Sequence, residues 1–248
     1  MKQISKITKQ AGRKSATIVG ALSFLLVGGA HAQTFTIETL QADGSNLKTN
    51  SIVSDSANFA WSFDNNGGTQ TVNGITFQEG KSAAISNASV NFRIDQAGAN
   101  GPYTGSFATV MNEFADSDTP SSGSIDLEID SLSVGQDYRL QMLHDTKFDT
   151  PNNNKRQMRV DYLGTNSFGG TAIASSATFE TDGPDLGALS IFEWTAGANT
   201  ERWEIVAENG RANFQGAVLQ AVPEPSAVAL LMGLGSLTFV ALRRRRNG

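Results

Sequence analysis

Cysteine is absent from this 248-residue sequence, and histidine occurs only twice, at His31 and His144. Without cysteine the chain forms no disulfide, offers no thiolate to a metal ion and has no thiol nucleophile. Its folded part must therefore depend on a hydrophobic core, because no covalent cross-link holds it together. The scarcity of histidine also excludes a zinc site built from several imidazoles.

Long apolar runs are few as well, and the first lies near the start of the chain, at 16–29. The small residues of Ala30-His31-Ala32 follow it, as they do at a signal peptidase site. The basic residues that precede it are Lys2, Lys6, Lys9, Arg13 and Lys14. The pattern predicts a signal peptide over 1–32 that enters the Sec translocon and is cleaved before Gln33. An uncleaved N-terminal anchor is the alternative.

The second apolar run, 226–242, carries no charge along its whole length. As a helix it would extend roughly 25 Å, which suffices to span a bilayer with little tilt. The helix must begin after Pro225, since proline lacks an N–H group and clashes with the preceding turn. The arginines at 243–246 then remain in the cytoplasm by the positive-inside rule, so both ends place the middle of the chain outside it. An amphipathic surface helix is the alternative, but the run shows no polar face.

A sorting signal is indicated where this tail begins. The sequence Val222-Pro223-Glu224-Pro225-Ser226, the apolar run and then Arg243, Arg244, Arg245 and Arg246 together resemble the PEP-CTERM signal of exported proteins in Gram-negative bacteria. The resemblance implies recognition by an exosortase, a membrane protease or transpeptidase that cleaves close to the Pro-Glu-Pro motif. It also implies a transient inner-membrane intermediate and a final place at the cell surface or in the extracellular matrix of a biofilm.

Acidic residues dominate the segment between the two ends. Residues 33–222 contain 10 Lys and Arg against 23 Asp and Glu, a net charge of −13. Such a body repels nucleic acid phosphates and has no basic patch to bind them, which excludes a nucleic acid partner. The charge favours solubility and attracts cations.

Short alternating stretches, separated by Gly, Asn, Asp and Ser, predict that 33–221 is one all-β domain. Sustained helical periodicity is absent, so we expect a two-sheet, jelly-roll-like β-sandwich between the signal helix 1–32 and the tail 222–248. A β-helix is the alternative, although no fixed repeat supports it. The alternating stretches are Phe35/Ile37/Thr39, Phe59/Trp61/Phe63, Val90/Phe92/Ile94, Ile125–Asp130, Tyr138–Leu143, Arg156–Tyr162, Leu189–Trp194, Arg202–Ala207 and Asn213–Ala221.

Two details of these strands bear on function. In Ile125–Asp130 the three aliphatic residues share one face and the three carboxylates the other, which predicts a solvated acidic stripe; a metal site there is the alternative. Trp61, Trp194 and Trp203 lie in alternating strands, so we expect them to pack in the core, although sugar stacking is an alternative. The segment 195–200 looks like a hairpin loop, and 64–68 like a hairpin turn.

A second resemblance concerns the body. Val134-Gly135-Gln136, the strand from Asp137 to Asp145, the strand 156–161 and the closing stretch 210–219 are similar to malectin-like and galactose-binding-like β-sandwiches. The similarity implies an association with polysaccharide. The expected site is the loop 144–155, held between two strong strands, together with neighbouring arginines. The candidate ligand-binding residues are Arg139, His144, Asp145, Asp149 and Arg159. Calcium bound by oxygens of this loop, and an ordinary polar connection, are the alternatives.

Enzymatic motifs are lacking. No Gly-x-Ser-x-Gly elbow occurs, and a Ser-His-Asp triad would have to use His144. Carboxylates are so numerous that a pair of them is no evidence for a glycosidase. We therefore expect a non-enzymatic exported protein without a cofactor or a metal site. An exported glycan-active hydrolase and a calcium-stabilised matrix or adhesion protein are the alternatives.

Overall fold

The computed structural model of the chain describes residues 33–48, 59–63, 69–79, 88–91, 93–95, 103–111, 114–117, 123–145, 156–181 and 187–222. The predictions for the signal peptide 1–32, the turn 64–68, Asp149 and the tail from Pro223 onward lie outside these residues. Among the described residues no helix is long and apolar enough to cross a membrane.

Most of the described residues belong to β-strands, and the larger sheet has seven of them. In order across this sheet the strands are β1 (Thr34–Thr39), β13 (Ala188–Thr195), β9 (Asp137–His144), β16 (Gly216–Ala221), β2 (Phe59–Ser62), β4 (Ile75–Glu79) and β3 (Gln70–Val72). Neighbouring strands are antiparallel except β2 and β4, which are parallel. The strands predicted at 35–39, 138–143 and 189–194 are confirmed.

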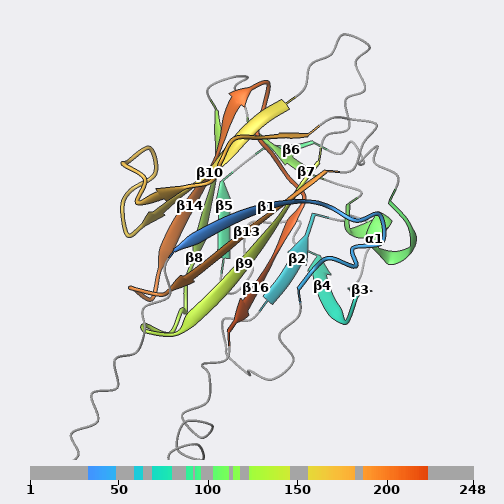
Figure 1. Cartoon of the computed structure of the whole chain (residues 1–248), viewed down its shortest axis with the longest axis horizontal. Helices are drawn as coiled ribbons and strands as arrows, with labels where there is room; N and C mark the ends of the chain where they lie inside the picture. Colours follow the sequence, from blue (N-terminus) through green and yellow to red (C-terminus); the bar gives the residue numbers. More distant parts are fainter. Residues whose placement is uncertain are drawn as a thin grey trace, which may run out of the picture.

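A six-stranded sheet lies behind the first one (Figure 1). Its strands are β11 (Ala174–Ser175), β10 (Arg156–Gly164), β14 (Glu201–Asn209), β8 (Ser124–Ile129) and β5 (Ala88–Asn91), with β12 (Phe179–Thr181) also paired to β10. A small third sheet contains β15 (Asn213–Phe214), β7 (Phe114–Asp116) and β6 (Arg93–Asp95). The chain is therefore mostly β, as predicted, with two main sheets.

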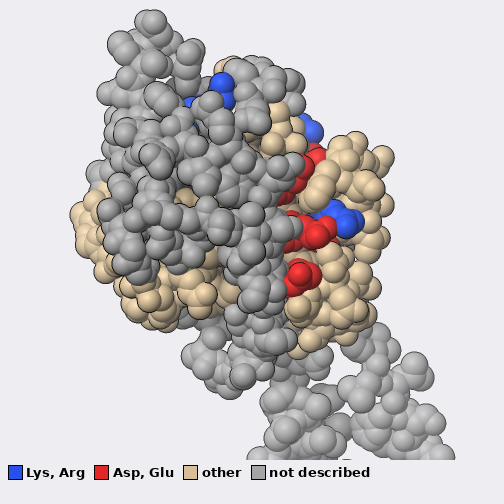
Figure 2. All heavy atoms as spheres, turned by 180° about the vertical axis from the view of Figure 1, so that it is seen from behind, with Lys and Arg blue, Asp and Glu red and all other residues tan. Residues whose placement is uncertain are grey.

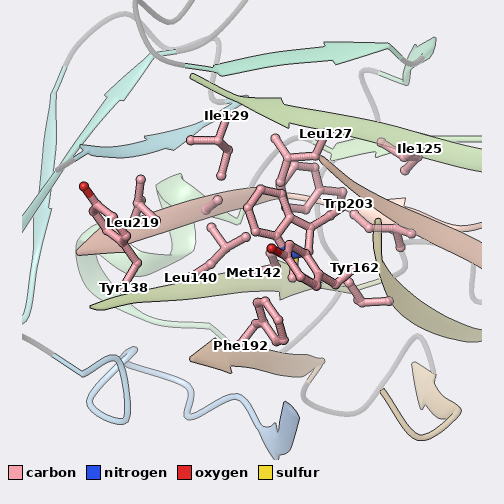
Figure 3. Close-up of a cluster of buried hydrophobic side chains, with 14 of the residues drawn as sticks. Ile125, Leu127, Ile129, Tyr138, Leu140, Met142, Tyr162, Phe192, Trp203 and Leu219 are labelled. Atoms are coloured by element: carbon pink, nitrogen blue, oxygen red, sulfur yellow. The ribbon is translucent and has the colours of Figure 1, made fainter. Parts of the chain in front are cut away.

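The main core fills the space between the two large sheets. Ile125, Leu127 and Ile129 of β8 point toward Leu140 and Met142 of β9, and all five are fully buried (Figure 3). Side chains alternate across a strand, so every second residue of each sheet enters this layer. The three tryptophans are at most 1% exposed. Their predicted place in the core is confirmed.

A second apolar cluster covers the other face of the seven-stranded sheet. Leu143, Leu189, Ile191 and Val218, which alternate with the residues of the main core, pack there. Ala60, Val72, Ile75 and Phe77 of the same sheet also belong to this cluster, and the residues packed over it are Leu40, Leu47, Phe107, Val110 and Met111. Phe107 and Val110 belong to α1 (Gly105–Val110), a short helix that the sequence analysis did not predict. Six residues are too few to produce a sustained helical period, so the sequence pattern hides this helix.

Two loops cross between the large sheets at one end of the molecule. Residues 130–136 lead from β8 to β9, and residues 196–200 lead from β13 to β14. The prediction that 195–200 closes a hairpin is wrong, because β13 pairs with β1 and β9 whereas β14 pairs with β8 and β10. Both strands alternate in the same way, and local pattern alone does not reveal that they join different partners.

Candidate functional site

His144 and Asp145 lie at the end of β9 and are both buried. Gln215, also buried, holds this end in place: its Oε1 accepts from the Asp145 N–H at 2.7 Å, and its Nε2 donates to the Asp145 carbonyl at 2.6 Å. Tyr103 lies beside Asp145, and its pKa is raised, first by burial and then by the charge of Asp145. The structure therefore places these two candidate residues within a hydrogen-bonded part of the protein interior.

Both ring nitrogens of His144 have partners. Nδ1 lies 2.9 Å from the carbonyl oxygen of Asn213, which only accepts, so we assign the proton to Nδ1. Nε2 then accepts from the hydroxyl of Ser190 at 2.8 Å. Burial lowers the pKa of His144 to about 4. This Ser–His pair resembles the nucleophile and base of a hydrolase, but both side chains are fully buried, so the contact fits a structural role.

Acidification is expected to destabilise the protein through His144. The unfolded chain takes up a proton below its ordinary pKa of 6.5, while the native imidazole stays neutral down to about 4. The unfolded state binds more protons in this window, so stability falls as the pH falls from 6.5 to 4, by about 3 kcal/mol in total. Urea unfolding of the wild type and of His144→Gln across this range measures the effect.

The difference in unfolding free energy between the wild type and His144→Gln isolates the contribution of His144, because the carboxylates are present in both proteins. One of them, Glu204, acts in the opposite direction, since its pKa is raised by burial. Ser190→Ala is the matched control: it removes a hydrogen bond, with a loss of about 1 kcal/mol, but retains the dependence on pH. Parallel profiles of the wild type and His144→Gln would contradict this assignment.

The two arginine candidates lie on different sheets. Arg139 of β9 is on the outer face of the seven-stranded sheet, where its Nε is 2.6 Å from Oε1 of Glu193. Arg159 of β10 is on the outer face of the six-stranded sheet, between the buried Met158 and Val160. The structure therefore does not bring Arg139 and Arg159 together. Ligand binding by either one stays a prediction.

Arg159 belongs to a charged surface that sequence reasoning missed. Asp126, Glu204 and Asp161 are direct cross-strand partners on β8, β14 and β10, so their side chains form one row across the outer face. Figure 2 shows acidic side chains gathered with basic ones on this side of the molecule. Arg159 contacts Asp161 at 2.9 Å and pairs with Glu208. The three acids of the row are 35 or more residues apart in sequence, which is why no local motif signals it.

The acidic stripe predicted on β8 contributes to this surface. Asp126 and Glu128 are partly buried and Asp130 is exposed, while the aliphatic residues between them are buried, as predicted. Arg202 of β14 pairs with Glu128 at 2.6 Å. Among the described residues no group of three or more His, Asp and Glu side chains is arranged to hold a metal ion.

The loop 165–173, between β10 and β11, folds back over the same face. The Gly169 N–H donates to Oε1 of Glu204, and Arg202 donates to the carbonyl of Thr165 at 3.2 Å. The guanidinium of Arg202 lies 5.6 Å from the ring centre of Phe168, which is 37% exposed. We call Asp126, Arg159, Asp161, Phe168, Arg202 and Glu204 the outer-sheet site. It combines carboxylates, guanidinium groups and one accessible aromatic ring.

Comparisons with solved structures give several matches, among them three remote ones. A family 35 carbohydrate-binding module from an environmental isolate shares 18% identity, covers 58% of this chain and 96% of its own, and has a TM-score of 0.36. A family GH115 4-O-methyl-α-glucuronidase with specificity for decorated arabinogalactans shares 14% identity over 53% of this chain and 16% of its own (TM-score 0.31). The enzymatically active domain of bacteriophage CBA120 tailspike protein 4 shares 13% identity, and the match covers 56% of this chain and 20% of its own, with a TM-score of 0.31.

A comparison with curated protein sequences gave no match. The family model of the PEP-CTERM protein-sorting motif matches residues 221–246. This match contains all five residues of the predicted motif, from Val222 to Ser226, and the four arginines that follow the apolar run. The motif implies passage through a membrane and processing by an exosortase. The chain is thus an exported protein that carries a PEP-CTERM sorting motif at its C-terminal end.

Proposed function

We propose that this protein is a non-enzymatic component of the cell surface or extracellular matrix that associates with polysaccharide. The sorting motif at 221–246 is the observation that carries the proposal, because it directs a folded β domain out of the cell. We also propose a signal peptide over 1–32 that is cleaved, a transmembrane helix over 226–242 and a jelly-roll connection of the strands. The proposed setting is the biofilm of a Gram-negative bacterium.

The outer-sheet site supports the association with polysaccharide. Carboxylates accept hydrogen bonds from sugar hydroxyls, guanidinium groups donate to hydroxyl and ring oxygens, and an exposed aromatic ring covers the apolar face of a sugar. Arg159 is held by Asp161 within the site, and Arg202 is held by Glu128 beside it, so both guanidinium groups are positioned before a ligand arrives. The net charge of −13 disfavours anionic polymers, and we therefore propose a neutral glycan as the ligand.

The proposal that the protein is not an enzyme is supported by the placement of its reactive groups. The pair His144 and Ser190 is buried without exposure to solvent. Asp161 and Glu128 are each engaged by an arginine, so both carboxylates already have a partner at the outer face. A glycan-active hydrolase is the alternative. Calcium binding by the loop 144–155, which includes Asp149, stays a prediction.

Binding to neutral glycans is expected to depend on Phe168. The fragment 33–222, which contains every described residue, is applied to an array of neutral and anionic glycans. Phe168→Ala should weaken binding to the neutral ligand about tenfold, the value of one stacked aromatic ring. Val134→Ala, which removes an exposed side chain elsewhere, should bind as the wild type does. Assays for released reducing ends on the bound glycan should show no turnover.

Two results would contradict the proposal. Turnover of the bound glycan would favour the hydrolase. Equal binding by the wild type and Phe168→Ala would place the ligand outside the outer-sheet site. Melting curves of both variants show whether a loss of binding reflects a loss of structure.

A further inference from the structure

The ladder between β16 and β9 continues to the last residue before the Pro-Glu-Pro motif. The Val222 N–H donates to the carbonyl of Asp137 at 2.7 Å. The carbonyl of Val222 accepts from Nε2 of Gln136 at 2.8 Å, and the same nitrogen lies 2.9 Å from the Asp137 carbonyl. Both backbone groups of Val222 are therefore bound. The hydrogen-bonded part of the domain therefore extends to Val222, the residue directly before Pro223 in the sequence.

Gln136 is itself held by its surroundings. Its N–H donates to the carbonyl of Ser133, and its carbonyl accepts from the N–H of Ala196 at 2.9 Å. Leu132 and Asn199 connect the two sheet-crossing loops: the Leu132 N–H donates to the Asn199 carbonyl, and Nδ2 of Asn199 donates to the Leu132 carbonyl at 2.8 Å. We call residues 131–136 and 196–200 the crossing end. Its backbone, together with the side chains of Gln136 and Asn199, forms one hydrogen-bonded unit with Val222.

The crossing end differs chemically from the rest of the domain. None of its residues is charged, although the exposed Asp130 precedes them in the first loop and the body around them has a net charge of −13. Val134, at the tip of its first loop, is 60% exposed, more than any other large hydrophobic residue that the structure describes. An anionic lipid surface would repel the acidic faces of the domain but not this end.

Both ends of the folded chain leave the domain on this side. Thr34 at the start of β1 pairs with Glu193, Glu193 with Arg139, and Arg139 with Gln220 near the end of β16. These four residues form one row across the seven-stranded sheet. β1 begins and β16 ends at the same end of that sheet (Figure 1), where β9 begins and β13 ends, next to the crossing end. The segments predicted to meet the membrane, before Gln33 and after Val222, thus continue from the same end.

We propose that the crossing end lies against the lipid bilayer while the C-terminal segment anchors the chain, with Val134 in contact with lipid and Gln136 as the positioning residue. The inference rests on the proposed transmembrane helix. Only residues 223–225 separate Val222 from that helix, and fully extended they span roughly 10 Å. The headgroup layer is itself roughly 5–7 Å deep on each side, so the domain has almost no freedom to move away from it.

The absence of cysteine makes the orientation directly measurable. Val134→Cys is labelled with a fluorophore in the chain from Gln33 to Gly248, which is inserted into phosphatidylethanolamine–phosphatidylglycerol vesicles containing a nitroxide-headgroup lipid. Ser106→Cys on α1 is the matched control. It is exposed and belongs to the opposite end, where the hydroxyl of Tyr103 accepts from the Gly187 N–H. About half of the fluorescence or more should be lost at position 134, and less than about a tenth at position 106.

Two further variants test the role of Gln136. Gln136→Ala frees the carbonyl of Val222, and ten Gly and Ser residues inserted after Val222 separate the domain from the anchor. Quenching at position 134 should fall to less than half of its original value in the insertion variant and by a smaller amount in Gln136→Ala. A loss of stability alone, which melting curves detect, would not make the insertion variant lose more quenching than Gln136→Ala does.

Flotation of the vesicles separates this inference from the proposed anchor. A chain that does not float with the vesicles overturns the transmembrane helix and the orientation together. A chain that floats, but whose labels at 134 and 106 are quenched alike, overturns the orientation alone. Unchanged quenching at 134 after the ten-residue insertion would also overturn it, because the close approach would then not depend on the connection at Val222.

Discussion

Replacement of Glu224 by Ala, or deletion of 243–246, is expected to leave the protein unprocessed in the inner membrane. Glu224 is the one charged residue between the folded domain and the apolar run, and a proline stands on each side of it in the sequence. An exosortase that reads the motif would therefore lose its only charged contact in Glu224→Ala. We expect the processed form to fall from most of the protein to an undetectable amount.

The deletion acts through membrane topology. Moving an arginine to the bilayer centre costs about 2.5–3.5 kcal/mol, so four of them would fix the cytoplasmic end of the proposed transmembrane helix. Without them the apolar run is free to shift or to pass through the membrane, and the motif no longer stays at a defined height. Both variants thus fail for different reasons, one in recognition and the other in placement.

Intact mass combined with fractionation of cells measures both effects. The wild type should yield a species outside the cell that starts at Gln33 and ends near 223–226. Asn247→Ala, which lies just beyond the arginines, is the control and should be processed normally. Release of both altered proteins at the normal level would refute sorting through this signal. A wild-type protein retained with its full tail would instead mean a simple C-terminal anchor.

Glu201→Ala is expected to lower the free energy of unfolding by about 3 kcal/mol. The carboxylate of Glu201 is 1% exposed and accepts from Nε1 of Trp194 at 2.6 Å and from the N–H groups of Gly197 and Ala198 at 2.7 and 3.1 Å. Its removal leaves the buried Nε1 of Trp194 without an acceptor, which costs about 1–3 kcal/mol. It also removes the acceptor of the partly exposed N–H groups of Gly197 and Ala198, which water can replace at a smaller cost. The loop 196–200, which connects the two sheets, would then lose its internal support.

Urea unfolding at neutral pH measures this loss. Glu193→Ala is the matched control: Glu193 lies on β13, is 39% exposed and pairs with Arg139, so its removal should change stability by at most about 1 kcal/mol. Glu201→Gln retains one acceptor oxygen but turns an NH₂ group toward the donors, and it should fall between the two. Equal stabilities of Glu201→Ala and Glu193→Ala would show that the three hydrogen bonds contribute little.

Local alternation predicted most strands because it depends only on neighbours in sequence. The pattern at Ile125–Asp130 needs no partner to show which face is buried, and β8 follows it. The prediction of a single uninterrupted strand failed where the chain passes from one sheet to another. Residues 90–94 are divided between β5 and β6, and 213–221 is divided at Gln215 into β15 and β16, in different sheets. The polar side chain of Gln215 binds the backbone of Asp145, a partner 70 residues away that no local pattern reveals.

The candidate site shows the same limit. Sequence reasoning favoured the loop 144–155 because polar residues cluster there, but His144 and Asp145 turn inward and their hydrogen bonds reach Ser190, Asn213 and Gln215. The outer-sheet site was missed because its residues come from four separate segments. Its one aromatic ring, Phe168, follows a strand by four residues in a loop that looks like an ordinary connection.

The sequence by itself determined the sorting motif, the acidic character of the body and its all-β class. Each of these depends on composition or on short-range order: the charge of a residue, the period of a strand, or the sequence Pro-Glu-Pro before an apolar run. The tertiary structure alone decided which strands pair, that 196–200 crosses between sheets, that His144 is buried, and that Gln136 binds Val222 at the exit of the chain. These features arise from contacts between residues distant in sequence, whose free energy depends on the whole packed domain rather than on any one segment.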